Sequence, residues 1–173
     1  MYMILAHGIG WLGTAFYIFS YQCKSSRRLV FYQIVGAVLY TVHYIMLGAF
    51  SGALIQSIAI LGNTVVCCSG RRWADWSGWR WVLSLFLVVS MVFSWEGLRS
   101  RLPCVASVTM ILARFTRNGR RIRLTCLFVS SPCWLTYNTL THSWSGVFCE
   151  GFTICSILIS IARYGMKALD RKD

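Results

Sequence analysis

The residue of this chain best placed to do chemistry is Glu150, the only carboxylate inside a long apolar stretch of the sequence. It stands about four residues after a predicted tight turn, so at ~1.5 Å of rise per helical residue it lies roughly 6 Å below that turn. Asn138 approaches the same turn from the preceding apolar stretch and is expected at a similar depth. An ionisable group in such a stretch faces protein or water rather than lipid, so Glu150 is the first candidate for a binding site.

Other polar and aromatic side chains within apolar stretches extend this candidate site. Tyr40 and Tyr44 share one helix face because they are four residues apart, and Trp134 and Asn138 have the same spacing in a later stretch. Aromatic rings that flank a cleft would suit a sugar or an aromatic solute, although such rings also form packed cores. The complete candidate set is Glu150, Asn138, Trp134, Tyr44, Tyr40, Gln56, His43 and Asn63.

Two interpretations of the polar members of this set stay open. In the first, they form one layer that lines an outward-facing vestibule, which binds a small polar or cationic solute or passes a proton through Glu150. In the second, the helix dipole stabilises Glu150, which hydrogen-bonds Asn138, so that the layer holds helices together. His43 suits this helix-packing role. The layer would contain His43, Tyr44, Gln56, Asn138 and Glu150.

Motifs of known catalytic chemistry are absent from the sequence. It has no HExxH zinc motif, no GxSxG nucleophile elbow and no glycine-rich phosphate loop. Glu150 has no second carboxylate within an apolar stretch, so paired acid–base chemistry lacks one of its members. The adjacent cysteines Cys67 and Cys68 have no His or Cys partner at metal-ligand spacing. We therefore expect no enzymatic activity, no cofactor and no metal site.

Seven apolar stretches must position these side chains. Apolar residues make up 57% of the 173 residues and charged residues only 13%, about half the share with which a soluble domain covers its surface. About 20 helical residues cross a bilayer, and these stretches are apolar on every face, unlike barrel strands. The predicted fold is therefore an all-α membrane protein with seven transmembrane helices. Their expected ranges are residues 3–22, 29–48, 51–69, 80–95, 103–116, 122–141 and 146–164.

The basic residues between these stretches predict the orientation of the chain. Arg99 and Arg101 fall on one face, whereas the other fifteen of the 17 Lys and Arg residues fall on the opposite face. Cytoplasmic loops carry the excess of positive charge, so we expect the N-terminus outside and the C-terminus in the cytoplasm. The fifteen are Lys24, Arg27, Arg28, Arg71, Arg72, Arg80, Arg114, Arg117, Arg120, Arg121, Arg123, Arg163, Lys167, Arg171 and Lys172.

The net charge of +12 could also indicate nucleic-acid binding. The segment from Arg71 to Trp81 mixes Arg with Trp, as a site for single strands would. The same mixture suits the headgroup region of a membrane, and the other basic residues lie in short loops where the positive-inside rule places them. We therefore expect the lipid bilayer, and not nucleic acid, to be the partner.

The first three predicted helices and the last three have the same layout. Each set has a helix, a basic loop, a second helix, an uncharged tight turn and a third helix. A shift of 94 residues aligns them without a gap from the second helix through the third, and it places Ser51 on Ser145 and Tyr44 on Asn138. We expect two parallel three-helix bundles, joined by an interfacial segment and a linker helix and followed by a cytoplasmic tail. The corresponding ranges are 1–69, 70–97, 98–164 and 165–173.

Three blocks of sequence carry a resemblance to a known family. They are Val42–Gly48, Pro132–Asn138 and Ser145–Gly151, the last running on to Tyr164. On these blocks the chain resembles the bacterial inner-membrane YgjV family over essentially its whole length. That family is distantly similar to the SWEET and PQ-loop proteins of the MtN3-like superfamily. The resemblance implies parallel repeats with a site between the bundles and an inner-membrane location, more firmly than it implies an activity.

The chain departs from the PQ-loop pattern at the end of its first predicted helix. There the sequence reads Ser20-Tyr21-Gln22, with no proline before the glutamine. Pro132 could supply a comparable hinge, because it removes one backbone hydrogen bond from the sixth helix. The sequence therefore does not predict the PQ-loop rocking mechanism for this chain.

Together these observations predict a single multi-pass domain in the bacterial inner membrane. Its predicted function is to transport a small polar solute, or facilitate its passage, through a cleft between the two bundles. The alternative is a non-transporting membrane protein with a structural, assembly or sensing role. Both bundles lie in one chain, so a monomer suffices, and a homo-oligomer is also compatible with the repeat. A water-filled cleft would let an impermeant thiol reagent reach Cys149 from the outside.

Overall fold

The computed structural model of the protein describes residues 2–20, 26–68, 70–95, 97–116 and 119–168. Helices and short turns account for these residues and no strand is found among them, so the predicted all-α fold is confirmed. Outside the described part lie Cys23, residues 169–173 and the side chains of Lys24, Arg27, Arg28, Arg117, Arg163 and Lys167.

Each predicted membrane helix coincides with a helix of the structure, with small differences at its ends. The fifth begins after a short 3-10 turn at Leu98–Ser100. The sixth is built from two helices that a π-helical turn at Cys126–Ser130 joins without a break. The helices are α1 (Tyr2–Ser20), α2 (Ser26–Met46), α3 (Phe50–Cys67), α4 (Trp79–Phe93), α5 (Arg101–Phe115), α6 (Gly119–Thr125), α7 (Ser131–Leu140) and α8 (Trp144–Ala168).

The irregular turn in the sixth helix comes directly before Pro132. Proline has no backbone N–H, and its ring clashes with the carbonyl group four residues earlier, which here belongs to Phe128. The helix widens to π geometry over Cys126–Ser130, and Pro132 then stands in the first turn of α7. A π-helical turn therefore precedes Pro132 in the sixth helix, a feature frequent at functional sites, and the hinge at Pro132 stays a prediction.

A tight turn with a glycine in the left-handed conformation joins α2 to α3. The N–H of Ala49 donates to the carbonyl oxygen of Tyr44 at 2.9 Å, and that of Gly48 to the carbonyl oxygen of Ile45 at 3.1 Å. Gly48 has φ +71°. This pair of bonds is the usual glycine-dependent helix C-cap, which satisfies the last carbonyl groups of α2.

The turn between α7 and α8 repeats this backbone geometry. The N–H of Ser143 donates to the carbonyl oxygen of Asn138 at 2.8 Å, and that of His142 to the carbonyl oxygen of Thr139 at 3.2 Å. His142 has φ +54°, a left-handed conformation that side chains other than glycine seldom adopt. Each of these four residues stands 94 positions after its counterpart in the first turn, the separation that also relates Tyr44 to Asn138.

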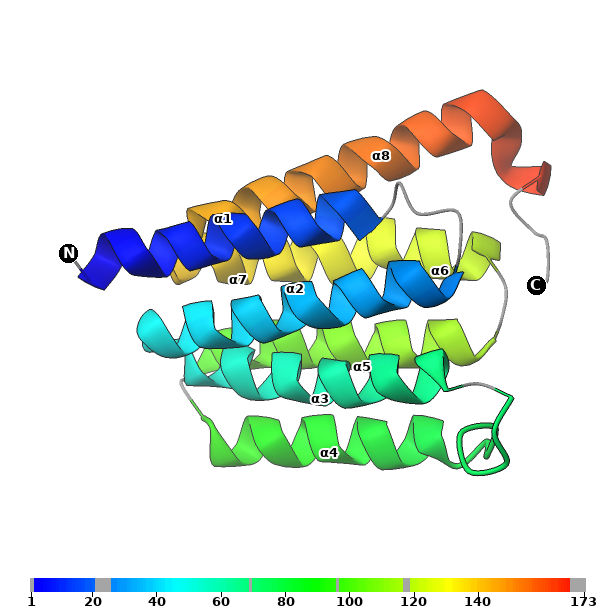
Figure 1. The fold of residues 1–173 in the computed structure, drawn as a ribbon, viewed down its shortest axis with the longest axis horizontal. Helices are drawn as coiled ribbons and strands as arrows, with labels where there is room; N and C mark the ends of the chain where they lie inside the picture. The colour runs from blue at the N-terminus through cyan, green and yellow to red at the C-terminus, as the bar shows by residue number, and fades with distance from the viewer. Residues whose placement is uncertain (1, 21–25, 69, 96, 117–118, 169–173) are drawn as a thin grey trace.

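The helices lie side by side, and both tight turns lie at the same end of the bundle (Figure 1). We call this end, where α1 begins, the turn end. The opposite end, which we call the loop end, carries the segment 70–78 and the last residues of α8.

Six of the helices form a closed ring. In it α1 contacts α2 and α8, α3 contacts α2 and α5, and α7 contacts α5 and α8. α4 lies outside the ring against α3 and α5 (Figure 1). The equivalent helices of the two halves are α1 and α5, α2 and α7, and α3 and α8. When each helix is replaced by its equivalent, every contact between neighbours in the ring becomes another contact of the ring. The two halves of the ring are therefore packed alike, and equivalent helices run in the same direction.

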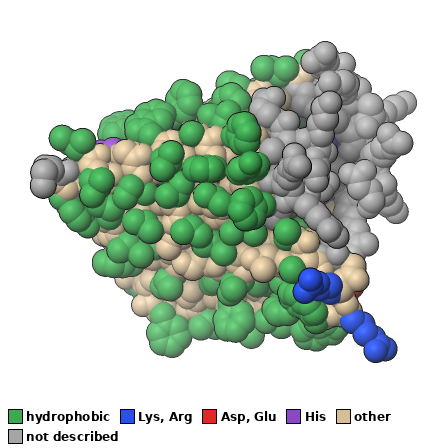
Figure 2. All heavy atoms as spheres, in the orientation of Figure 1, with side chains coloured by type: hydrophobic (Ala, Val, Ile, Leu, Met, Phe, Trp, Pro, Cys, Tyr) green, Lys and Arg blue, Asp and Glu red, His purple; other side chains and the backbone are tan. Residues whose placement is uncertain are grey.

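Apolar side chains are spread over the described face in Figure 2, and the blue Lys and Arg side chains visible on this face lie at the loop end. Phe93 is 84% exposed and Ile4 is 78% exposed. Among the described residues, α1 and α3 are each long and apolar enough to cross a membrane. Shorter apolar helical stretches occupy Phe31–Met46, Trp79–Phe93 and Trp144–Ile159.

Basic and aromatic side chains meet at both ends of the bundle. At the loop end the guanidinium of Arg80 lies 5.5 Å from the ring centre of Trp81, and at the turn end that of Arg101 lies 5.4 Å from the ring centre of Trp95. Trp81 and Trp95 are both exposed. This is the arrangement expected of side chains at the two headgroup levels of a membrane.

Two of the three α1 glycines are sites of close helix contact. A Cβ atom on Gly10 would meet the Ser145 hydroxyl and lie 2.9 Å from the His43 ring, and one on Gly13 would lie 3.1 Å from Tyr40. Gly8 has nothing within 4 Å of such an atom, so it is not a site of close contact.

The glycine contacts generate a matched pair of substitutions. We expect Gly10→Ala to lower the stability of the protein by about 1–3 kcal/mol, because the methyl group forces α1 away from α2 and α8. Gly8→Ala, on the exposed side of the same helix, should leave stability unchanged or raise it slightly. The measurement is the melting temperature of the purified protein in detergent. Equal melting temperatures for the two variants would contradict the close packing of α1.

Candidate functional site

Buried polar side chains close the turn end of the ring. We call this group the turn-end seal; it consists of His43, Tyr44, Ser51, Tyr137, Asn138, Ser143 and Ser145, none more than 2% exposed. The Tyr44 hydroxyl donates to Asn138 Oδ1 at 2.7 Å. The Tyr137 hydroxyl lies 2.9 Å from Ser51 Oγ and accepts a hydrogen bond from the backbone N–H of Gly52. Each bond joins α2 or α3 to α7, so the seal holds the two halves of the ring together.

His43 lies in the seal and crosslinks three helices. Its Nδ1 is 2.7 Å from the carbonyl oxygen of Ala6, and a carbonyl can only accept, so Nδ1 carries the hydrogen. Nε2 is then the acceptor for the Ser143 hydroxyl at 2.8 Å, with Ser145 Oγ at 3.5 Å. The ring nitrogens are thus satisfied by α1 and by the turn before α8, and His43 does not line the cavity described below.

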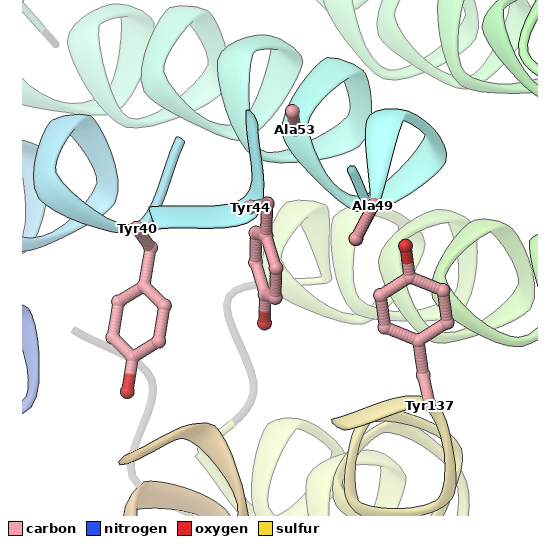
Figure 3. Close-up of a cluster of buried hydrophobic side chains, with 5 residues drawn as sticks. All are labelled: Tyr40, Tyr44, Ala49, Ala53 and Tyr137. Atoms are coloured by element: carbon pink, nitrogen blue, oxygen red, sulfur yellow. The ribbon is translucent and has the colours of Figure 1, made fainter. Parts of the chain in front are cut away.

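The seal repeats itself across the ring axis. Tyr44 and Asn138, which bond each other, are separated by 94 residues and so are each other's counterparts under the sequence shift. Under the same shift, Tyr137 corresponds to His43 and Ser51 corresponds to Ser145. The contact between Tyr137 and Ser51 is therefore the counterpart of the contact between His43 and Ser145. Tyr44 points from α2 toward α7 and α8, while Tyr137 points from α7 toward the α2–α3 turn (Figure 3).

A cavity of about 190 Å³ lies inside the ring, directly below the seal. Residues from every helix of the ring line it, together with Leu83 and Leu87 of α4. It extends from Asn138 and Gly146 beside the turn end to Val66 and Phe115 beside the loop end. Its turn-end boundary is buried, whereas Val66 is 44% exposed.

Glu150 lines this cavity from α8. The Ser131 hydroxyl lies within hydrogen-bonding reach of its carboxylate, and Ser131 Oγ is also 3.5 Å from Cys126 Sγ. The expected hydrogen bond between Glu150 and Asn138 is not found among the described residues, and the described side-chain partner of Asn138 is the Tyr44 hydroxyl. The π-helical turn before Pro132 brings Cys126 and Ser130 to the same cavity wall.

A continuous run of aromatic rings forms another wall. Ring centres follow one another from Tyr17 to Tyr40 at 5.7 Å, from Tyr40 to Tyr44 at 5.7 Å and from Tyr44 to Trp134 at 6.0 Å. The last pair is stacked, with an interplanar angle of 18°. All four residues line the cavity, and they also belong to one packed cluster of side chains. Core packing and cavity lining are therefore not exclusive alternatives for these rings.

The hydroxyl groups of this aromatic wall are engaged by protein partners. Gln56 Nε2 donates to the Tyr17 hydroxyl at 2.9 Å. The Tyr40 hydroxyl lies 2.6 Å from Thr14 Oγ1, and Tyr44 donates to Asn138 as described above. The wall therefore presents mainly ring surface to the cavity.

A second bond between the halves crosses the loop end. Arg114 Nη1 of α5 donates to Asn63 Oδ1 of α3 at 2.8 Å, and both residues line the cavity. Asn63 is 5% exposed, whereas Arg114 is exposed. The cavity edge at this end is thus formed by an exposed cation, in contrast to the buried seal at the other end.

The structure brings together seven of the eight predicted site residues as cavity-lining residues, and places His43 in the seal. In the described part of the chain, no vestibule opens at the turn end, where the sequence predicted one. The turn-end seal is buried, and the cavity extends toward the loop end instead. This layout follows from the buried hydroxyls and amides at the turns, which satisfy one another and leave no room for water.

Sequence reasoning missed four residues of this region. Tyr137 could have been found as the counterpart of His43 under the 94-residue shift. Ser131 and Arg114 carry no signal of their own, because a serine in an apolar helix and an arginine at a helix end are common. Tyr17 follows Gly13 by one helical turn, and only the packing of α1 against α2 directs its ring to the cavity.

Within the described ranges, no three His, Cys, Asp or Glu side chains converge to hold a metal ion. An apolar exterior around a closed ring with a polar interior is the architecture of a helical membrane protein. The chain belongs to the Imp-YgjV family of bacterial inner membrane proteins, whose family model matches residues 4–168. No curated protein and no solved structure matches the chain.

The cavity predicts the side from which water reaches Cys149, which lines it. In a variant whose only cysteine is Cys149, an impermeant maleimide should label the protein from the loop end and not through the seal. With the predicted orientation, labelling occurs in inside-out vesicles and not in intact spheroplasts. A variant that keeps only Cys155, exposed on α8 away from the cavity, is the control for reaction outside the cavity. Labelling of Cys149 from the turn end would contradict a sealed end.

Proposed function

We propose that this protein is a transporter or facilitator of a small polar solute with seven membrane-spanning segments in a 3+1+3 arrangement. The N-terminus is outside and the C-terminus in the cytoplasm. The helices α1–α3 form one bundle, α5–α8 form the other, and α4 links them. The solute occupies the cavity between the bundles.

The cavity on the ring axis is the observation that carries this proposal. It lies between the halves, one of its ends is sealed by buried hydrogen bonds, and the other reaches exposed residues. A solute path that is closed on one side and reachable on the other is what alternating access requires of each state. With the proposed orientation, this structure is the state that faces the cytoplasm.

The seven-span arrangement is supported by the direction and packing of the helices. Each helix of the first bundle has a counterpart in the second that runs the same way, and the ring contacts are equivalent. The exterior is apolar, and Arg–Trp pairs mark both ends. The described segments 70–80 and 119–123, which carry six of the fifteen basic residues, lie at the loop end, which supports a cytoplasmic loop end.

Transport requires that the seal opens while the loop end closes. The bonds that must break run between the bundles, from Tyr44 to Asn138, from Tyr137 to Ser51 and Gly52, and from His43 to Ser143. The bond from Arg114 to Asn63 is the corresponding link at the loop end. We assign these contacts to gating, and Glu150, Gln56 and the aromatic wall to solute binding.

The density of bonds in the seal also suits the second candidate, a structural or sensing membrane protein whose bundles never separate. Seven buried polar residues that satisfy one another would then serve only to fix the packing of the halves. The two candidates differ in whether a solute exchanges across the membrane.

Solute counterflow into proteoliposomes separates the candidates. The labelled panel spans sugars, amino acids, organic cations and organic anions. We expect at least one to exchange, and Glu150→Gln to reduce that exchange at least tenfold while the protein stays folded. Asp75→Asn, which removes a carboxylate from the exposed segment before α4, is the matched control and should exchange normally. No exchange of any panel member, with Glu150→Gln merely lowering the melting temperature, would favour the structural candidate.

A further inference from the structure

We infer that the solute of this cavity is a small monovalent organic cation, which Glu150 and the rings of Tyr17, Tyr40, Tyr44 and Trp134 bind together. This inference rests on the proposed transport function and names the class of solute. A carboxylate beside several aromatic faces is the arrangement that recognises alkylammonium groups, because the ring faces carry negative potential.

The state of the aromatic hydroxyls argues against a polyol. A sugar is recognised by groups that can donate to and accept from its hydroxyls. Here the hydroxyls of Tyr17, Tyr40 and Tyr44 already bond Gln56, Thr14 and Asn138 at 2.6–2.9 Å. What the wall offers a solute is therefore the surface of its rings, which favours apolar or cationic groups.

The charges along the cavity argue for a cation. Glu150 is the only acidic residue among those that line it, and its described partner is one neutral hydroxyl, that of Ser131. A carboxylate taken away from bulk water gains most from a mobile cation. Arg114, the one basic residue of the lining, is exposed and already donates to Asn63 Oδ1 at the loop-end edge.

The size of the cavity limits the solute. About 190 Å³ is somewhat more than the ~150 Å³ of an engineered cavity that binds benzene, a molecule of six carbon atoms. A solute of similar bulk has about six to eight non-hydrogen atoms, well below the drug-sized ligands that fill larger pockets. Choline and ethanolamine fall within this limit and carry one positive charge.

Three molecules of nearly the same shape test the charge requirement. Choline is a cation, glycine betaine is its zwitterionic analogue, and 3,3-dimethylbutan-1-ol replaces the charged nitrogen by carbon. We expect labelled choline to exchange into proteoliposomes of the full chain, and excess unlabelled choline or ethanolamine to compete. The betaine and the neutral alcohol should compete at least tenfold less well. Glu150→Gln should abolish the exchange, whereas Glu150→Asp, which keeps the charge, should retain part of it.

The outcomes separate this inference from the proposed function. If betaine or the neutral alcohol competes as well as choline, the cation assignment is wrong while transport stands. If choline does not exchange but another class in the broad counterflow panel does, the cation assignment is again wrong and transport stands. If no solute of either panel exchanges, both are overturned. Thermal unfolding with and without choline gives a second readout, since a bound cation should stabilise the parent but not Glu150→Gln.

Discussion

The rest of the structure depends on one constraint, which is that polar groups buried between the two halves must satisfy one another without water. The Tyr44 hydroxyl and the Asn138 amide meet this constraint at the ring axis, at 2.7 Å. Because the two residues occupy equivalent positions in the two halves, a single contact fixes both the register and the rotation of one half against the other. The bonds of Tyr137 with Ser51 and of His43 with Ser145 follow from that placement.

The cavity begins where the hydrogen bonds of the turn-end seal give way to other side chains. At the turn end, small residues such as Gly10 and Gly52 let helices and aromatic rings approach closely, and no space is left. Toward the loop end the partners become long or irregular, with the π-helical turn at Cys126–Ser130 on one side and Gln56 and Asn63 on the other. The cavity lies between these residues, and Glu150 lines it with the neutral Ser131 hydroxyl as its described partner. The two halves share one repeated layout of helices, but the residues along the helices differ between the turn end and the loop end. The cavity is therefore sealed at the turn end and reaches exposed residues at the loop end.

Periodicity and charge in the sequence were sufficient to predict the helices, and the 94-residue shift predicted which helices correspond. Turn geometry was also accessible, because Gly48 and His142 mark equivalent positions. The layer of polar residues was predicted, but its division into seal and cavity lining was not. Depth along a helix does not reveal which way a side chain turns, so Asn138 was paired with Glu150 when its real partner is its own counterpart, Tyr44. Ser131 and Tyr17 could be placed only by tertiary packing.

The most direct test of this account exchanges the two residues at the axis. Tyr44→Asn leaves two short amides that cannot meet, and Asn138→Tyr crowds two rings into one site, so each should lower the melting temperature. If the halves are equivalent about the axis, the double variant Tyr44→Asn/Asn138→Tyr recreates the same bond from the opposite side. It should then recover most of the loss, with a coupling free energy above ~1 kcal/mol. A double variant whose loss equals the sum of the two single losses would contradict the account.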